Sequence, residues 1–154
     1  MDKDEIYMKA ALAEAAKARR RGEVPVGAVV ISQGRIMARG RNRMIGATDP
    51  TAHAEVVALR LAARRIGNYR LSGCDLYVTI EPCAMCLGAA VLARIRRLVY
   101  GAADPKAGAV RSALVFPFEN VNHRIEVRSG ILAGECGRVL KDFFKEKRHR
   151  KSRS

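Results

Sequence analysis

Segments with the residue pattern of strands alternate with segments that have the pattern of helices along this chain of 154 residues. Short apolar runs rich in Val and Ile predict strands, and longer amphipathic runs that end at glycine predict helices. Strands that alternate with helices are joined by crossovers, which place helices on both faces of a largely parallel sheet. The sequence therefore predicts an α/β fold, a three-layer α/β/α sandwich with a five-stranded mixed sheet.

The expected elements follow one another without repeats. A hairpin over residues 25–42, turning at Gln33 and Gly34, is expected to form one antiparallel edge of the sheet. The next helix is expected to begin just before His53, with Asp49 or Thr51 as its cap, and to stop at Gly67. Further helices are expected over 4–21, 83–95 and about 131–147, a short one within 102–120, and strands over 75–80, 96–101 and 124–129.

Length and composition favour one domain. A hydrophobic content of 49% is enough for one core. We expect a single domain over residues 1–147 and a basic C-terminal tail over 148–154. The longest apolar stretch is far shorter than the roughly 20 residues of a membrane span, and "MDKDE" is unlike the start of a secretory signal. A soluble, cytoplasmic protein with reduced cysteines and no membrane partner is expected.

The chain is strongly basic, with 29 Lys and Arg against 15 Asp and Glu and a net charge of +14. From Arg138 onward, eight basic residues less two acidic ones leave +6. Such an excess predicts a polyanionic partner; the alternative for the final residues is a solvated, frayed tail. Aromatic residues make up only 5%, so any contact with nucleic acid should be mainly electrostatic, with few base pockets.

Two cysteines three residues apart, Cys83 and Cys86, lie in "TIEPCAMC". Pro82 suits the first turn of a helix, so both cysteines are expected in that turn and on one face. The helix N-terminus favours thiolates, the form that binds zinc. The alternative, a thioredoxin-like redox pair, leaves the upstream "TAHAE" without a role.

"TAHAE" contributes His53 and Glu55 at the start of another helix. His53, Cys83 and Cys86 would give zinc three protein ligands and leave one position for water, the pattern of a catalytic site. Glu55, about 200° around the helix from His53, suits acid–base chemistry better than ligation. A closed structural zinc site would need a fourth ligand without ligand-like spacing: His123, His149, Cys74 or Cys136.

Together, "HAE" and "EPCAMC" resemble the signature of zinc-dependent nucleoside and nucleobase deaminases. Over residues 5–147 the chain is similar to bacterial tRNA adenosine deaminases, through "DPKAGA", "NHRIEV" and the basic final helix. The resemblance implies a cytidine-deaminase-like fold, one Zn²⁺ per subunit and a homodimer with the helix after Cys86 at its interface. It implies hydrolysis of adenosine to inosine at the wobble position of a tRNA anticodon loop, with Glu55 moving the protons.

Four further residues are implied in substrate binding. Asn42 would hold the flipped nucleoside, Val26 would wall the base pocket, and Asp104 would lie in a nucleotide-contacting loop. Each has a plainer alternative: Asn42 as a turn residue after a strand, Val26 as a core residue, and Asp104 as a turn former before proline. Phe143 and Phe144 are adjacent on the final helix, so either one packs while Phe144 meets a base, or both pack.

Two other functions remain open at this point. A deaminase of a free nucleobase such as guanine or cytosine would explain the zinc ligands but not the basic final helix. A zinc-stabilised RNA-binding module without catalysis would explain the charge but not Glu55.

Overall fold

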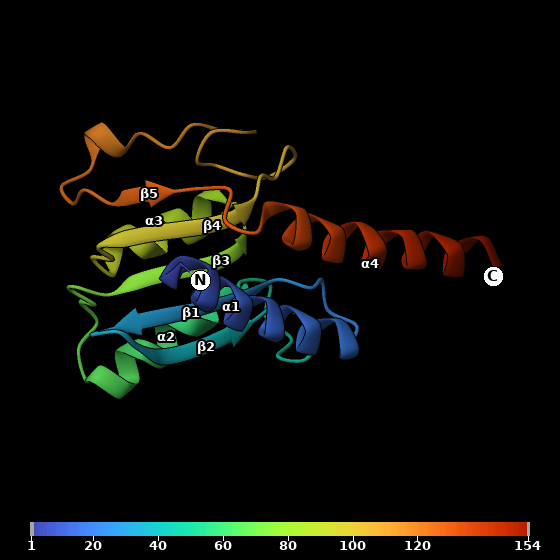
Figure 1. Cartoon of the computed structure of the whole chain (residues 1–154), viewed down its shortest axis with the longest axis horizontal. Coiled ribbons are helices and arrows are strands. Elements are labelled where there is room, and N and C mark those ends of the chain that lie inside the picture. The colour runs from blue at the N-terminus through green and yellow to red at the C-terminus, as the bar shows by residue number, and fades with distance from the viewer. Residues whose placement is uncertain (1, 154) are drawn as a thin grey trace.

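The computed structural model describes residues 2–153 and contains a five-stranded sheet with the strand order β2-β1-β3-β4-β5. Helices α1 and α4 cover one face of the sheet, and α2 and α3 cover the other (Figure 1). The predicted three-layer sandwich is confirmed. The elements are α1 Lys3–Arg20, β1 Gly27–Ser32, β2 Arg35–Arg41, α2 Ala54–Ile66, β3 Asp75–Ile80, α3 Ala84–Leu92, β4 Arg97–Ala102, the 3₁₀ turn η1 Phe118–Asn120, β5 Glu126–Arg128 and α4 Ala133–Arg153.

The sheet is mixed, but its antiparallel strand is not at the edge. Strand β1 runs antiparallel to both β2 and β3, whereas β3, β4 and β5 are parallel. The hairpin of β1 and β2 forms one edge of the sheet through antiparallel pairing, as expected, and the edge strand β2 runs in the same direction as β3. Burial explains why β1 and not β2 is the inner strand of the hairpin. Nearly all of β1 is buried, so it requires a neighbour on each side, whereas β2 has exposed positions suited to an edge.

Apolar side chains fill the space on both faces of the sheet. Leu76 and Val78 of β3 pack toward α2 and α3, and Tyr77 between them packs toward α1. Strand β2 approaches α2 closely at Gly40, where an added Cβ would lie 2.4 Å from the carbonyl oxygen of Ala54. Glycine at this position lets the first turn of α2 lie directly against the end of β2.

Two helices begin one residue later than their motifs suggested. His53 itself is the N-cap of α2, and the expected caps are wrong, because Asp49 instead accepts a hydrogen bond from the backbone N–H of Thr51 within a turn. Cys83 is the N-cap of α3, so Pro82 lies outside the helix and not in its first turn. Gly67 ends α2 in the left-handed conformation, as predicted.

Helix α4 is longer than expected and extends beyond the end of the sheet (Figure 1). It continues to Arg153, so residues 148–153, predicted as a tail, continue the helix. No helix within residues 2–153 combines the length and apolar character needed to cross a membrane. All four cysteines are free, and Cys74 and Cys136 are buried.

Candidate active site

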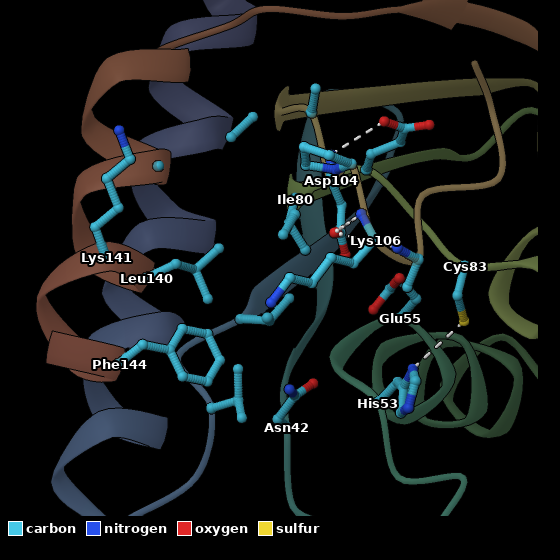
Figure 2. A pocket seen from close by; sticks show the side chains of 18 of the residues that line it. Asn42, His53, Glu55, Ile80, Cys83, Asp104, Lys106, Leu140, Lys141 and Phe144 are labelled. Atoms are coloured by element: carbon cyan, nitrogen blue, oxygen red, sulfur yellow. Dashed lines mark hydrogen bonds between the residues drawn. The ribbon is translucent and has the colours of Figure 1, made fainter. Parts of the chain in front are cut away.

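The carboxyl ends of three strands meet at one edge of the sheet, and a cavity of about 680 Å³ opens there. Asn42 follows β2, Cys83 lies shortly after β3, and Asp104 follows β4. Figure 2 shows these residues around the cavity with Glu55 and Phe144. The structure thus brings together every predicted site residue; Cys86 alone does not line the cavity, being buried beside it.

Three donor atoms converge at the start of α2 and α3. His53 Nδ1 lies 3.6 Å from Cys83 Sγ and 3.5 Å from Cys86 Sγ, and all three donors lie within 4.8 Å of one another. A tetrahedral zinc ion, with ligand bonds of about 2.0–2.3 Å, separates its ligand atoms by about 3.5–3.8 Å. The donor set therefore fits a tetrahedral metal ion.

The donors share their protons unequally. The hydrogen bond with Cys86, followed by the one with His53, lowers the pKa of the Cys83 thiol to about 4. The hydrogen bond with Cys83 is also the main reason that the pKa values of Cys86 and His53 are raised. Cys83 is thus the most acidic thiol of the group, and a metal ion would replace the shared protons.

Glu55 lies in the first turn of α2, is only 3% exposed and lines the cavity. It is not one of the three clustered donors. The expected helical rotation is not what separates it from His53, because His53 is the extended N-cap and not a helical residue. Burial raises the pKa of the Glu55 carboxyl above its usual range.

Asn42 and Val26 each have a structural role and also line the cavity. Asn42 Oδ1 accepts a hydrogen bond of 2.8 Å from the backbone N–H of Ala54, which anchors the start of α2 to the end of β2. Val26 belongs to the core between the sheet and α2. Both residues also line the cavity, so structural and substrate-binding roles are compatible at these positions.

Asp104 is a turn former that also lines the cavity. Its Oδ1 accepts hydrogen bonds from the backbone N–H groups of Lys106 at 3.0 Å and Ala107 at 3.2 Å. On α4, Phe143 is 9% exposed and packs inward, whereas Phe144 is 42% exposed and lines the cavity. Of the two alternatives left open for this pair, these exposures agree with the one in which only Phe143 packs.

Sequence reasoning missed two buried glutamates that hold loops, and one of them, Glu81, lines the cavity. Glu23 accepts backbone hydrogen bonds from Ile45 and Gly46, in the loop between β2 and α2. Glu81, 2% exposed, accepts hydrogen bonds from the loop after β4. Burial raises the pKa of Glu81, but hydrogen bonds led by the one from the backbone of Arg111 lower it overall. The one sequence signal was an acidic residue directly after a buried strand.

Basic side chains surround the cavity as well. Lys106 follows the turn at Asp104, and Lys141 and Arg148 lie on α4 near Phe144. Together they place positive charge around a cavity whose inner residues include apolar side chains. A ligand that combines a planar base with phosphate groups fits this distribution.

Comparisons with known proteins agree with this geometry. Residues 1–148 match the MafB19-like deaminase family. The tRNA-specific adenosine deaminase of Haemophilus influenzae is 50% identical over 151 residues, covering 96% of this chain and 87% of the relative. A structure from a study of A-to-I editing by tRNA:A34 deaminases at the wobble position superposes with a TM-score of 0.83, at 48% identity, covering 87% of this chain and 98% of that one.

A guanine deaminase from Nitrosomonas europaea is more distant. It superposes with a TM-score of 0.78 at 26% identity, covering 90% of this chain and 83% of its own. The predicted cytidine-deaminase-like fold and the resemblance found in the sequence are confirmed. The chain belongs to a deaminase family, that of the tRNA-specific adenosine deaminases.

Proposed function

We propose that this protein is an enzyme that hydrolyses the 6-amino group of adenosine to give inosine at the wobble position of a tRNA anticodon loop, with release of ammonia. One observation carries the proposal. A single cavity joins the His53–Cys83–Cys86 donor set and buried Glu55 to aromatic and basic side chains of α4. The first part suits deamination of a base, and the second suits RNA around that base.

We propose Zn²⁺, one ion per subunit, as the metal held by His53, Cys83 and Cys86. One imidazole and two thiolates are ligands that zinc prefers, and three protein ligands are typical of catalytic zinc sites. When bound, zinc supplies activation of water at neutral pH.

Glu55 is the proposed acid–base residue. Its carboxylate takes a proton from the attacking water and passes it to N1 of adenine. It then takes the second proton from the hydroxyl group now bound to C6 and delivers it to the amino group, which leaves as ammonia. Its burial in the cavity wall supports this role, because the carboxyl lies beside the donor set without belonging to it.

The substrate-binding roles follow from position. With Asn42 Oδ1 occupied by the start of α2, the amide nitrogen is the group available to the nucleoside. Val26 contributes an apolar wall, and Asp104 shapes the adjacent turn. Exposed Phe144 offers a ring for stacking a neighbouring base of the loop.

The proposed partner is a tRNA anticodon stem-loop, bound by a homodimer. Met85 and Leu92 on α3 are 38% and 74% exposed, which supports α3 as the dimer interface.

We propose residues 1–147 as the deaminase domain and 148–154 as a basic segment that binds RNA. A tRNA substrate also favours a cytoplasmic location. Sedimentation of the unaltered protein and of the Leu92→Lys variant tests the proposed homodimer through α3. A monomeric unaltered protein would contradict the homodimer.

The deciding experiment compares substrates. The protein is incubated with an anticodon stem-loop that carries adenosine at the wobble position, and separately with free adenine, guanine and cytosine. We expect inosine in the stem-loop and no ammonia from the free bases, because neighbouring nucleotides supply binding energy that a free base lacks. Rapid release of ammonia from guanine, without inosine in RNA, would instead favour the nucleobase deaminase.

A further inference from the structure

One wall of the cavity is a loop that is held from beneath by a single carboxylate. The loop follows β4, and residues 103–107 line the cavity. Glu81 Oε1 accepts a hydrogen bond of 3.1 Å from the backbone N–H of Asp104, at the start of this loop. Glu81 Oε2 accepts three more, from the backbone N–H groups of Val110 at 3.0 Å, Arg111 at 2.9 Å and Ser112 at 3.1 Å.

These bonds join both ends of the loop to one point at the end of β3. The hydroxyl of Ser112 donates a further hydrogen bond to Glu81 Oε1. Within residues 2–153 Glu81 forms no ion pair, so its charge is stabilised by backbone N–H groups and this hydroxyl. Every bond requires an acceptor at the Glu81 side chain, which a carboxylate provides at both oxygens and an amide at only one.

The space between Glu81 and the loop admits only glycine at position 108. A Cβ added to Gly108 would lie 2.4 Å from Glu81 Cδ and 2.6 Å from the carbonyl oxygen of Asp104. The loop backbone therefore lies directly on the carboxylate. The loop that carries Asp104 and Lys106 thus depends on Glu81, which lines the cavity but is not one of the three clustered donors.

We propose that Glu81 is a positioning residue for the substrate: it holds residues 104–112 in the shape that completes the cavity wall, and thereby sets affinity for the RNA loop. The inference rests on the proposed function. Glu81 acts through the loop and does not touch the reacting atoms, so its loss affects RNA binding more than the chemical step.

The test uses Glu81→Gln in the full chain. We expect the Kd and KM for the anticodon stem-loop to rise about tenfold, with kcat within about twofold of the unaltered protein. Hydrogen exchange of peptides over residues 103–112 should accelerate, because the NH₂ group of Gln cannot accept the backbone N–H hydrogen bonds that one Glu81 oxygen accepts. Zinc content measured by mass spectrometry should stay unchanged. Ser112→Ala is the matched control, since it removes one hydroxyl bond and keeps the four backbone bonds.

Gly108→Ala gives an independent perturbation, because it displaces the same loop and leaves Glu81 intact. It should reproduce the higher Kd and the faster exchange. Unchanged exchange in Glu81→Gln, or faster exchange with an unchanged Kd, would overturn the proposal, as would loss of zinc together with kcat. If the unaltered protein forms no inosine, only the proposed function fails, because exchange and Kd are measured without turnover.

Discussion

Buried carboxylates at the two ends of α1 are stabilised in different ways. Near its start, Asp4 pairs with the guanidinium groups of Arg97 and Arg128. Beyond its end, Glu23 accepts hydrogen bonds from backbone N–H groups of the loop between β2 and α2, as Glu81 does from the loop after β4. Arginine partners connect the helix to strands of the sheet, whereas backbone partners hold loops. We infer that the Asp4 cluster (Asp4, Arg97 and Arg128) supports global stability, whereas the backbone-bound carboxylate at Glu81 supports the shape of the cavity.

The Asp4 cluster has the contacts expected of a structural tie. Arg97 Nη2 lies 2.6 Å from Asp4 Oδ2, and the hydroxyl of Tyr77 also donates to Asp4. Asp4 is only 4% exposed. The hydrogen bond from Arg97 is the main reason that the pKa of Asp4 lies far below its usual range, although burial opposes the shift. None of these residues lines the cavity.

The largest effect is expected at the cavity, from Glu55→Gln. Loss of the acid–base group should slow inosine formation by about 10²–10⁴-fold, the range of general acid–base catalysis. Single-turnover rates at saturating stem-loop measure this loss. Zinc content and the unfolding midpoint should stay near those of the unaltered protein, and Cys83→Ala, which removes a donor, should lose zinc. Equal loss of zinc in both variants would make Glu55 a ligand.

The second largest effect is expected at Asp4, near the start of α1. Asp4→Asn leaves the Arg97 guanidinium without its charge partner and should lower the free energy of unfolding by about 2–3 kcal/mol. The loss should not be larger, because the Arg97 side chain is 19% exposed and solvent screens part of its charge. Urea unfolding measures the change. The control Asp2→Asn, at an exposed position, should change it by less than about 0.5 kcal/mol. A folded Asp4→Asn protein with a lowered kcat would break the proposed separation between the two clusters.

The Asp4 contribution should also depend on pH in a defined direction. Its pKa is depressed in the folded state, so the stabilisation is present above the unfolded value of about 3.9 and is lost as pH falls toward the folded value. The difference in unfolding free energy between the unaltered protein and Asp4→Asn should therefore shrink between about pH 5 and pH 2. Urea titrations across this range measure it, and a constant difference would contradict the assignment.

The smallest effect is expected at the end of α4. Deletion of residues 149–154 removes Arg150, Lys151 and Arg153 but keeps Arg148, which lines the cavity. If these three residues each neutralise a phosphate, the slope of log affinity against log salt should decrease by about two units. Binding titrations at several salt concentrations measure the slope. An unchanged slope would mean that this segment does not contact RNA, and a lowered single-turnover rate would mean that it shapes the cavity.

Much of the fold followed from local patterns. The glycine stop at Gly67, the hairpin turn at Gln33 and Gly34, and the order of strands and helices were predictable because each depends on neighbouring residues. The position of β1 inside the sheet was not, because it depends on the burial of both of its faces. The caps at His53 and Cys83 were missed because neither side chain makes a capping hydrogen bond.

The candidate site divides in the same way. The meeting of His53 with Cys83 and Cys86 was predictable, since each motif begins a helix at the carboxyl edge of a sheet. The role of Glu81 was not, because its partners are backbone N–H groups 23 to 31 residues further along the chain. Backbone donors carry no residue identity, so no motif marks them.

The strand order has a consequence for the order in which the protein can assemble. After the hairpin, each new strand joins the same growing edge, so residues up to Leu92 already form three adjacent strands and all three metal donors. The later residues add β4, β5 and the helix that carries Phe144. A chain that emerges progressively from the ribosome would therefore complete its metal donor set before its RNA-facing wall, and would acquire chemistry before selectivity.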